Sequence, residues 1–202
     1  MNWKKDQEFE KEWWGDCVNT LGEEVKQIKY AELMGLKFFH NGKSPYNIDA
    51  ENKTILDIGG GAVSLLLKCT NLKQGIVLDP CNYPDWIINR YFLKNIIFIK
   101  SPAEDSLSLI RTFPKIDEVW IYNVLQHVEN VEKVTKNAKS VSKIIRIFEW
   151  IDTGISIGHP NNLTEELLNN LLNGYGKVVR LHEPQLKGKT YSGIFKGDLF
   201  NA

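Results

Sequence analysis

The sequence has no surplus of charge of either sign and few cysteines. Its 202 residues include 25 Lys and Arg against 25 Asp and Glu, so the formal net charge is zero. A protein that binds nucleic acid by bulk charge needs a basic excess to neutralise phosphates, so we expect no nucleic-acid partner. Cys17, Cys69 and Cys81 are odd in number and lack CxxC spacing. We therefore expect reduced thiols, no disulfide framework, no metal site and a cytoplasmic protein.

Long apolar runs and secretory signals are also missing. The best candidate, 62–67, ends at Lys68 and falls well short of the ~18 residues that a membrane span needs. The N-terminus alternates charged residues and has no apolar core of a signal peptide, so we expect no membrane association. Hydrophobic residues make up 43% of the chain, which is enough to bury a core. At about 150 residues per domain, the length predicts one domain.

The first forty residues have a helical texture. Phe9, Trp13 and Cys17 recur every four residues, which is the spacing of one face of a helix. A second helix is expected after 20–23, where Thr and Glu have the spacing of a capping box, and it should stop at Gly35. Two helices are therefore predicted before the main fold.

From Lys53 onward, short apolar runs alternate with segments long enough for helices. The runs expected to be strands are 54–58, 75–79, 96–99, 118–122 and 144–150. The helical segments include 63–69, 131–142 and 163–172, the last with Thr164 as its cap, and two closing strands are expected at 176–183 and 191–197. This alternation indicates an α/β domain with a parallel sheet. We predict a helical cap over 1–40 and a doubly wound domain over 41–202, forming one structural domain overall.

The most informative stretch is ILDIGGGAVSLLLK, residues 55–68. A strand carries Asp57, a glycine turn follows at Gly59, and a helix is expected to begin near Val63. Glycines allow a sharp turn and close approach of a ligand, which the N–H groups of a helix N-terminus can also bind. Asp79 ends the next strand, where a carboxylate can accept both hydroxyls of a ribose. The pattern predicts a nucleotide-cofactor site, with a purely structural turn as the alternative.

Two other nucleotide-binding patterns fit less well. The fingerprint G-x-G-x-x-G of dinucleotide oxidoreductases, counted from Gly59, would need a glycine where this chain has Ser64. The G-K-[ST] of a P-loop does not follow the turn either. The sequence therefore disfavours an NAD-linked oxidoreductase and excludes a P-loop nucleotide triphosphatase.

Through the glycine turn and the acidic residues beside it, the sequence resembles the class I S-adenosylmethionine (SAM)-dependent methyltransferases over most of 53–200. Their first motif has an acid followed by G-x-G, matched here by Asp57, Gly59 and Gly61, with Gly60 between them. The resemblance implies a Rossmann-like, mostly parallel seven-stranded sheet with helices on both faces, whose last strand is antiparallel. It also implies that the loop holds the methionine part of SAM and that Asp57 reaches its amino group through water.

The family's second and third motifs are matched less completely. The resemblance assigns the ribose to Asp79 and places Pro80 against the adenine. The third motif often reads G-D-A-E, so Ala103 and Glu104 match, but Pro102 stands where an Asp commonly faces the adenine amino group. That contact is therefore absent or made by another group.

The fourth motif is the most specific likeness. The pattern D-x-V-x-x-x-N-V-L-x-H-V maps onto Asp117, Val119, Asn123, Val124, Leu125, His127 and Val128. It is typical of the branch that acts mostly on small molecules, and it differs from the N-P-P-Y of nucleic-acid amino-methyltransferases. The resemblance places Asn123 with the cofactor-binding residues.

Three side chains are candidates for the base that a proton-bearing oxygen or nitrogen nucleophile can need. His127 follows the fourth strand, Glu149 ends the fifth, and His159 lies in the next loop. Each has a plainer alternative, namely packing or helix capping for His127, a structural hydrogen bond for Glu149 and an ordinary loop position for His159. The aromatic side chains of the N-terminal segment, Trp13 among them, either close over the site or only pack the helices on the sheet.

The resulting hypothesis is a methyltransferase that moves the methyl group of SAM to an oxygen or nitrogen of a small-molecule acceptor, such as a sugar or another metabolite. S-adenosylhomocysteine (SAH) would be the product. The alternative is a non-catalytic module of the same fold that binds SAM or a partner.

Overall fold

The computed structural model describes residues 3–40, 42, 44–113 and 115–201, and its centre is a seven-stranded sheet. In spatial order the strands are β6 (Ile96–Lys100), β5 (Gln74–Asp79), β3 (Thr54–Ile58), β7 (Ile116–Tyr122), β8 (Ser142–Ile151), β10 (Leu186–Lys196) and β9 (Lys177–Glu183). The first five are parallel, and β10 is antiparallel to both of its neighbours. The predicted Rossmann-like sheet, with its last strand antiparallel, is confirmed.

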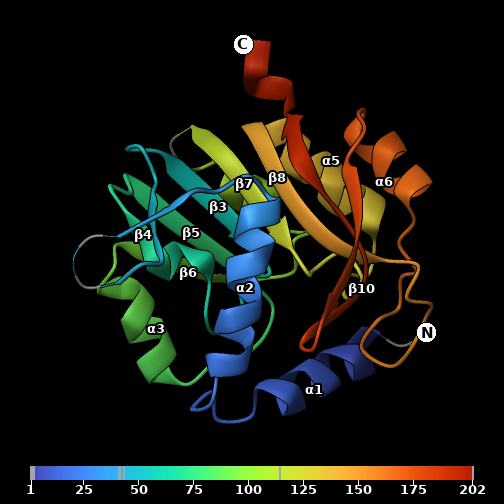
Figure 1. The fold of residues 1–202 in the computed structure, drawn as a ribbon. Coiled ribbons are helices and arrows are strands. Elements are labelled where there is room, and N and C mark those ends of the chain that lie inside the picture. The colour runs from blue at the N-terminus through green and yellow to red at the C-terminus, as the bar shows by residue number, and fades with distance from the viewer. Residues whose placement is uncertain (1–2, 41, 43, 114, 202) are drawn as a thin grey trace.

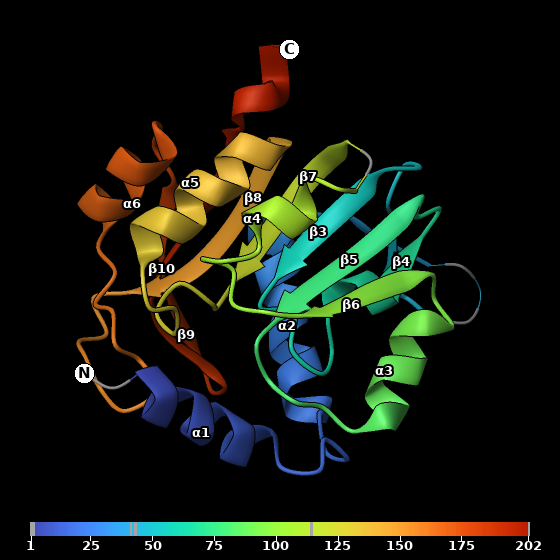
Figure 2. The ribbon, with the colours of Figure 1, turned by 180° about the vertical axis from the view of Figure 1, so that it is seen from behind.

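Helices cover both faces of this sheet (Figures 1 and 2). One face carries α2 (Leu21–Leu33) and α3 (Asp85–Phe92), and the other carries α4 (Leu107–Ile110), α5 (Val131–Val141) and α6 (Glu165–Leu172). Successive strand residues point to opposite faces, so Ile55 joins the core under α2 while Leu56 joins the core under α5. Every residue of β3 is buried, as expected for a strand covered on both faces. None of the helices in the described part of the chain has the length and apolarity needed to cross a membrane.

The two N-terminal helices exist, with some differences in detail. The first, α1 (Trp3–Trp14), stops at Gly15, so Cys17 lies beyond it in a left-handed conformation with φ of 60°. The capping box expected at the start of α2 does not form: Thr20 has a helical backbone conformation, with φ of −100° and ψ of 0°, and its hydroxyl makes no bond to the backbone of the first turn but donates to the Glu24 carboxylate at 3.1 Å. By contrast, Thr164 caps α6 as predicted, accepting from the backbone N–H of Leu167 at 3.1 Å.

The helix predicted from Val63 is wrong. The glycine turn leads into a single 3-10 turn, η1 (Leu65–Lys68), and then directly into a strand, β4 (Cys69–Thr70). That strand pairs with β2 (Asn47–Asp49), which pairs with β1 (Phe38–Phe39), forming a small second sheet that the sequence did not predict. The residues of β4, which a longer helix would include, pair with β2 instead. The face of the main sheet that such a helix would cover is covered by α2.

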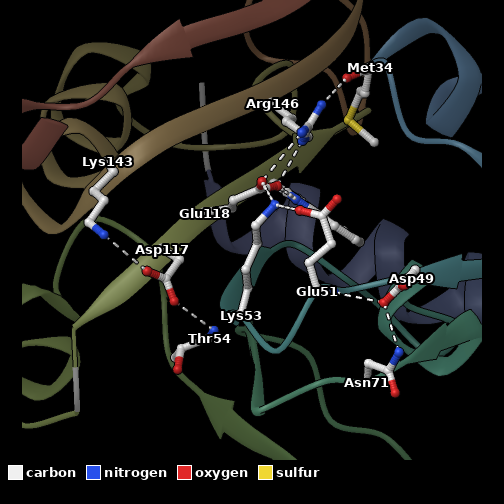
Figure 3. Close-up of polar contacts among 11 residues, drawn as sticks. Met34, Asp49, Glu51, Lys53, Thr54, Asn71, Asp117, Glu118, Lys143 and Arg146 are labelled. Atoms are coloured by element: carbon white, nitrogen blue, oxygen red, sulfur yellow. Dashed lines mark hydrogen bonds and ion pairs between the residues drawn. The ribbon is translucent and has the colours of Figure 1, made fainter.

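A buried ionic cluster ties α2 to the sheet (Figure 3). The carboxylate of Glu118, in β7, accepts from Arg146 Nε at 2.7 Å and from Lys53 Nζ at 2.9 Å. Arg146 also donates to the carbonyl oxygen of Met34, just after α2, at 3.0 Å. Burial alone would raise the pKa of Glu118, but the Arg146 and Trp120 hydrogen bonds outweigh it and lower this pKa to about 2. Glu118 is therefore a carboxylate that holds three elements together.

Candidate active site

A cavity of about 480 Å³ lies at the carboxyl ends of β3, β5 and β7, between the sheet, α1 and α2. This is the edge at which open α/β sheets bind ligands, and the volume suits a small molecule. The predicted site residues that line it are Gly59, Gly60, Gly61, Asp79, Pro80, Ala103, Glu104, Asn123, His127 and His159. Two predicted residues, Asp57 and Glu149, do not line it. In both ribbon views α1 runs below the strands on this side (Figures 1 and 2).

The glycine turn needs its glycines. Gly59 and Gly61 have φ of 70° and 62°, a region that other residues rarely adopt. A Cβ on Gly60 would lie 2.7 Å from Asp57 Oδ2, and one on Gly61 would lie 2.8 Å from the ring of Trp14. The turn is therefore pressed between the buried acid behind it and an indole from α1 in front of it.

Asp57 supports the turn from behind the cavity wall. Its Oδ2 accepts from the hydroxyl of Ser64 and, at 2.5 Å, from the hydroxyl of Tyr122. Burial raises the pKa of Asp57 to about 7, since these bonds only partly offset the loss of water. Its other oxygen, Oδ1, is buried with no hydrogen-bond partner among the described residues. This oxygen can accept from a water that bridges to a ligand, although Asp57 does not itself line the cavity.

Two residues that hold the turn were not predicted to do so. Tyr91, in α3, donates to the carbonyl of Gly61 at 2.7 Å and accepts from the N–H of Ser64 at 3.0 Å. Tyr122 accepts from the N–H of Leu65 at 3.0 Å. Ser64, which bonds to Tyr91, was singled out in the sequence only because a dinucleotide fingerprint would have a glycine at its position. Nothing local in the sequence indicated the tyrosines, which reach the turn from other elements.

Asp79 lies at the end of β5 with its carboxylate against the turn. Oδ2 accepts from the N–H of Gly61 at 3.1 Å, and Oδ1 accepts from the N–H of Cys81 at 2.8 Å and the hydroxyl of Tyr83 at 3.1 Å. Burial raises the pKa of Asp79, and these three donors oppose the rise. A carboxylate has about four acceptor positions, so room remains for a ligand hydroxyl.

The residues of the third motif line the cavity, and one of them also fixes a neighbouring helix. Pro102, Ala103 and Glu104 line the cavity. The Glu104 carboxylate accepts from the N–H groups of Glu129 and Asn130 at 2.8 and 3.0 Å, just before α5. Glu104 therefore fixes the start of α5, while Pro102 occupies the wall without a side-chain donor or acceptor.

Glu149 is placed behind the wall. Its Oε1 accepts from the N–H groups of Val124 and Leu125 at 3.0 and 2.9 Å, and its side chain is fully buried. Burial raises the pKa of Glu149 to about 7, although the two backbone bonds act against it. This placement favours the structural alternative, in which Glu149 holds the segment that follows Asn123.

His127 and His159 meet at the cavity. Their ring centroids are 4.6 Å apart. His127 Nδ1 lies 2.7 Å from the carbonyl oxygen of Gly158 and 3.0 Å from Glu10 Oε1. Burial alone would lower the pKa of His127, but the hydrogen bond to Glu10 and the charge of Glu10 raise this pKa above its ordinary value. For His159, burial and then the charge of His127 lower the pKa.

Comparisons with known proteins bear on the fold. The sequence matches no protein-family model and no curated protein. Solved structures do match. A 1,6-didemethyltoxoflavin-N1-methyltransferase from Burkholderia thailandensis, solved with bound 1,6-didemethyltoxoflavin and SAH, is 11% identical with a TM-score of 0.61, over 96% of this chain and 87% of that one. The fold is that of the class I SAM-dependent methyltransferases.

Two further structures have the same fold. A cyclopropane-fatty-acyl-phospholipid synthase-like protein from Lactobacillus casei is 11% identical with a TM-score of 0.61, over 87% of this chain and 90% of that chain. A SAM-dependent methyltransferase from Aquifex aeolicus is 18% identical with a TM-score of 0.50, over 96% and 99%. At these identities the likeness concerns the fold alone, so the acceptor has to be argued from the cavity.

Proposed function

We propose that this protein is a SAM-dependent methyltransferase acting on a small molecule. The observation that carries the proposal is the buried carboxylate of Asp79, which lines a small-molecule cavity beside the glycine turn. An acceptor-only group there, with a position left free, suits a hydroxyl of a ribose. SAM, when bound, supplies an electrophilic methyl group. Gly59–Gly61 would hold its methionine part, and Pro80 and Ala103 would lie beside its adenine.

The opposite part of the cavity would take the acceptor. One wall there consists of residues from a single face of α2, including Gln27 and Tyr30, together with Trp150 at the end of β8. Gln27 is 3% exposed, and its Oε1 is buried with no partner among the described residues. An unpaired buried acceptor is costly, so it favours a ligand that brings an O–H or N–H donor. This supports oxygen or nitrogen methylation of a hydroxylated or amine-bearing molecule, such as a sugar or another metabolite.

This chain's part in the reaction is positional together with one proton transfer. In-line displacement needs the nucleophile and methyl carbon about 3–3.5 Å apart and aligned, which a closed pocket provides. The indole of Trp14, at the end of α1, lines the cavity against Gly61 and would exclude water and face the sulfonium, whereas Trp13 lines the cavity but is 65% exposed. His127, which also lines the cavity, would take the proton of the nucleophile.

Calorimetric titration with SAM, SAH and NADH tests the cofactor. We expect micromolar binding of SAM or SAH and none of NADH. If only NADH binds, or nothing binds, the proposal is wrong. Transfer of tritiated methyl from SAM to monosaccharides, phenols and aromatic amines then tests catalysis. Binding of SAM without transfer to any acceptor class would favour the alternative of a non-catalytic SAM-binding module.

A further inference from the structure

The N-terminal helix contributes a carboxylate to the candidate base. Glu10 lies in α1, more than a hundred residues before His127, yet its Oε1 is 3.0 Å from His127 Nδ1. The side chains are only 18% and 17% exposed, so water screens the pair weakly. We propose that Glu10 is a positioning residue, which holds the imidazole of His127 so that the Nε2 lone pair acts as the base. Because Glu10 lies on α1, the base is held in this way only when α1 covers the cavity. This inference rests on the methyltransferase function proposed above.

The hydrogen-bond partners fix where the proton of the imidazole lies. Both groups that face Nδ1, the carbonyl oxygen of Gly158 and the carboxylate of Glu10, can only accept. Nδ1 therefore carries a proton whether His127 is neutral or charged. In the neutral ring the lone pair must lie on Nε2, and the side-chain nitrogen of Gln126, an N–H donor, is 3.3 Å from that atom. This is the tautomer that a base at Nε2 requires.

Two acidic side chains anchor α1 at this place. Asp6, one helical turn before Glu10, accepts from the N–H of Gly158 at 3.0 Å and is only 6% exposed. Phe9 packs so closely on Gly158 that a Cβ there would lie 2.6 Å from its ring. The segment that offers its carbonyl to His127 is thus held by the same helix that offers Glu10. Docking of α1 and orientation of the imidazole are coupled.

The charged groups around His127 come from three elements. Asp6 and Glu10 approach from α1, Glu149 lies in β8, and His159 lies in the loop beyond it. Of these, Glu10 is the carboxylate in direct contact, and it raises the pKa of His127. A base whose pKa is near the working pH is the most effective, and a paired carboxylate also stabilises the imidazolium as it forms.

The proton transfer accompanies the displacement at the methyl group of SAM. As the acceptor oxygen or nitrogen bonds to the methyl carbon, the carbon–sulfur bond breaks and its electron pair stays on the sulfur of SAH. His127 Nε2 receives the proton that the nucleophile loses. Glu10 keeps its charge and pairs with the resulting imidazolium.

The test is Glu10→Gln, with Glu12→Gln as the matched control. Glu12 lies on the same helix with its side chain exposed, so this control removes the same charge without touching the cavity. Nitrogen-15 NMR titration of the unliganded protein reports the tautomer and pKa of His127. We expect a protonated Nδ1 in the wild type, a lower His127 pKa in Glu10→Gln and an unchanged one in Glu12→Gln. The indole signals of Trp13 and Trp14 report whether α1 remains docked.

Turnover supplies the second readout. Base catalysis typically contributes ~10²–10⁴-fold, so Glu10→Gln should lose about tenfold or more in kcat, with SAH affinity within about threefold. Its kcat should also begin to fall at a lower pH on the acid side, because the neutral form of His127 is required. Equal His127 pKa values in Glu10→Gln and Glu12→Gln, or unchanged kcat in Glu10→Gln, would overturn the inference. Failure of the wild type to bind SAM would instead refute the proposed function, and the NMR result would be unaffected.

Discussion

Replacing Asp79 by asparagine removes the negative charge from the cavity wall while nearly preserving the volume of the side chain. In the wild type, Asp79 accepts three hydrogen bonds from the protein, from Gly61, Cys81 and Tyr83. An asparagine offers one acceptor atom instead of two. Its amide nitrogen would have to face at least one of those donors, or the ribose hydroxyls, and both arrangements are unfavourable.

The size of the effect follows from the number of bonds to the charged group. Three of the roughly four acceptor positions of Asp79 are taken by the protein, so a ribose hydroxyl would donate one bond, and a hydrogen bond to an ionised partner contributes about 1.5–3 kcal/mol. Because the single acceptor atom of asparagine remains occupied by the protein donors, this bond is lost and the expected loss is about 1.5–3 kcal/mol. Since 1.4 kcal/mol is a tenfold change, the Kd for SAH should rise roughly 10- to 150-fold.

Calorimetric titration with SAH is the assay, and thermal unfolding checks that the variant is folded. Tyr83→Phe is the control, because it removes one of the three protein donors and leaves the carboxylate in place. We expect its Kd for SAH to stay within about fivefold of the wild type. If Asp79→Asn were folded and bound SAH within threefold of the wild type, Asp79 would not be the ribose ligand and the reasoning would be refuted.

The remaining predictions concern the support of the site. Glu149→Gln should bind SAH nearly as well as the wild type. Its unfolding free energy, measured in urea, should fall by about 1–3 kcal/mol, because Glu149 accepts two backbone hydrogen bonds. Full stability with lower turnover would instead indicate a catalytic Glu149. Glu118→Gln should lose about 3–5 kcal/mol, because Arg146 is left buried without its partner, whereas Asp105→Asn in an exposed pair should lose under about 1 kcal/mol. The folded-state pKa of Glu118 is depressed to about 2, so its contribution is complete above the unfolded value near 4.5 and is lost as pH falls toward 2. Glu118→Gln should lack that part of the acid destabilisation.

The sheet was predictable because the sequence of each central strand indicates a strand by itself. The run 54–58 coincides with β3, and the run 144–150 lies inside β8. A central parallel strand is apolar on both faces, so its sequence differs from that of an amphipathic helix without reference to distant residues. The longer extent of β10, over Leu186–Lys196, depends on pairing with β8 and β9 and had no such local signal.

The parts of the site that sequence reasoning missed depend on contacts between distant segments. Asp6 and Glu10 look like ordinary solvent-facing charges of a helix, and only the docking of α1 brings them to Gly158 and His127. Gln27 is a similar case, since its pattern in α2 does not reveal that its side chain is buried at a cavity. Polar residues on helices are usually exposed, so burial of this kind cannot be recognised from periodicity.

Because a 3-10 turn follows the glycine turn in place of the helix predicted from Val63, a cofactor would be recognised differently. A helix N-terminus offers unpaired N–H groups to a ligand, and the glycine turn was expected to provide them. In the structure, the N–H groups of Ser64, Leu65 and Leu66 are already bonded, to the hydroxyls of Tyr91, Tyr122 and Ser64 respectively.

These three donors are therefore not available to a ligand, and recognition must depend more on side chains. Asp79 is the carboxylate in contact with the turn that also lines the cavity. A protein that offered free helix N–H groups could lose this acid and keep part of its affinity. Here we expect no such compensation, so the effect of Asp79→Asn should lie toward the upper end of its predicted range.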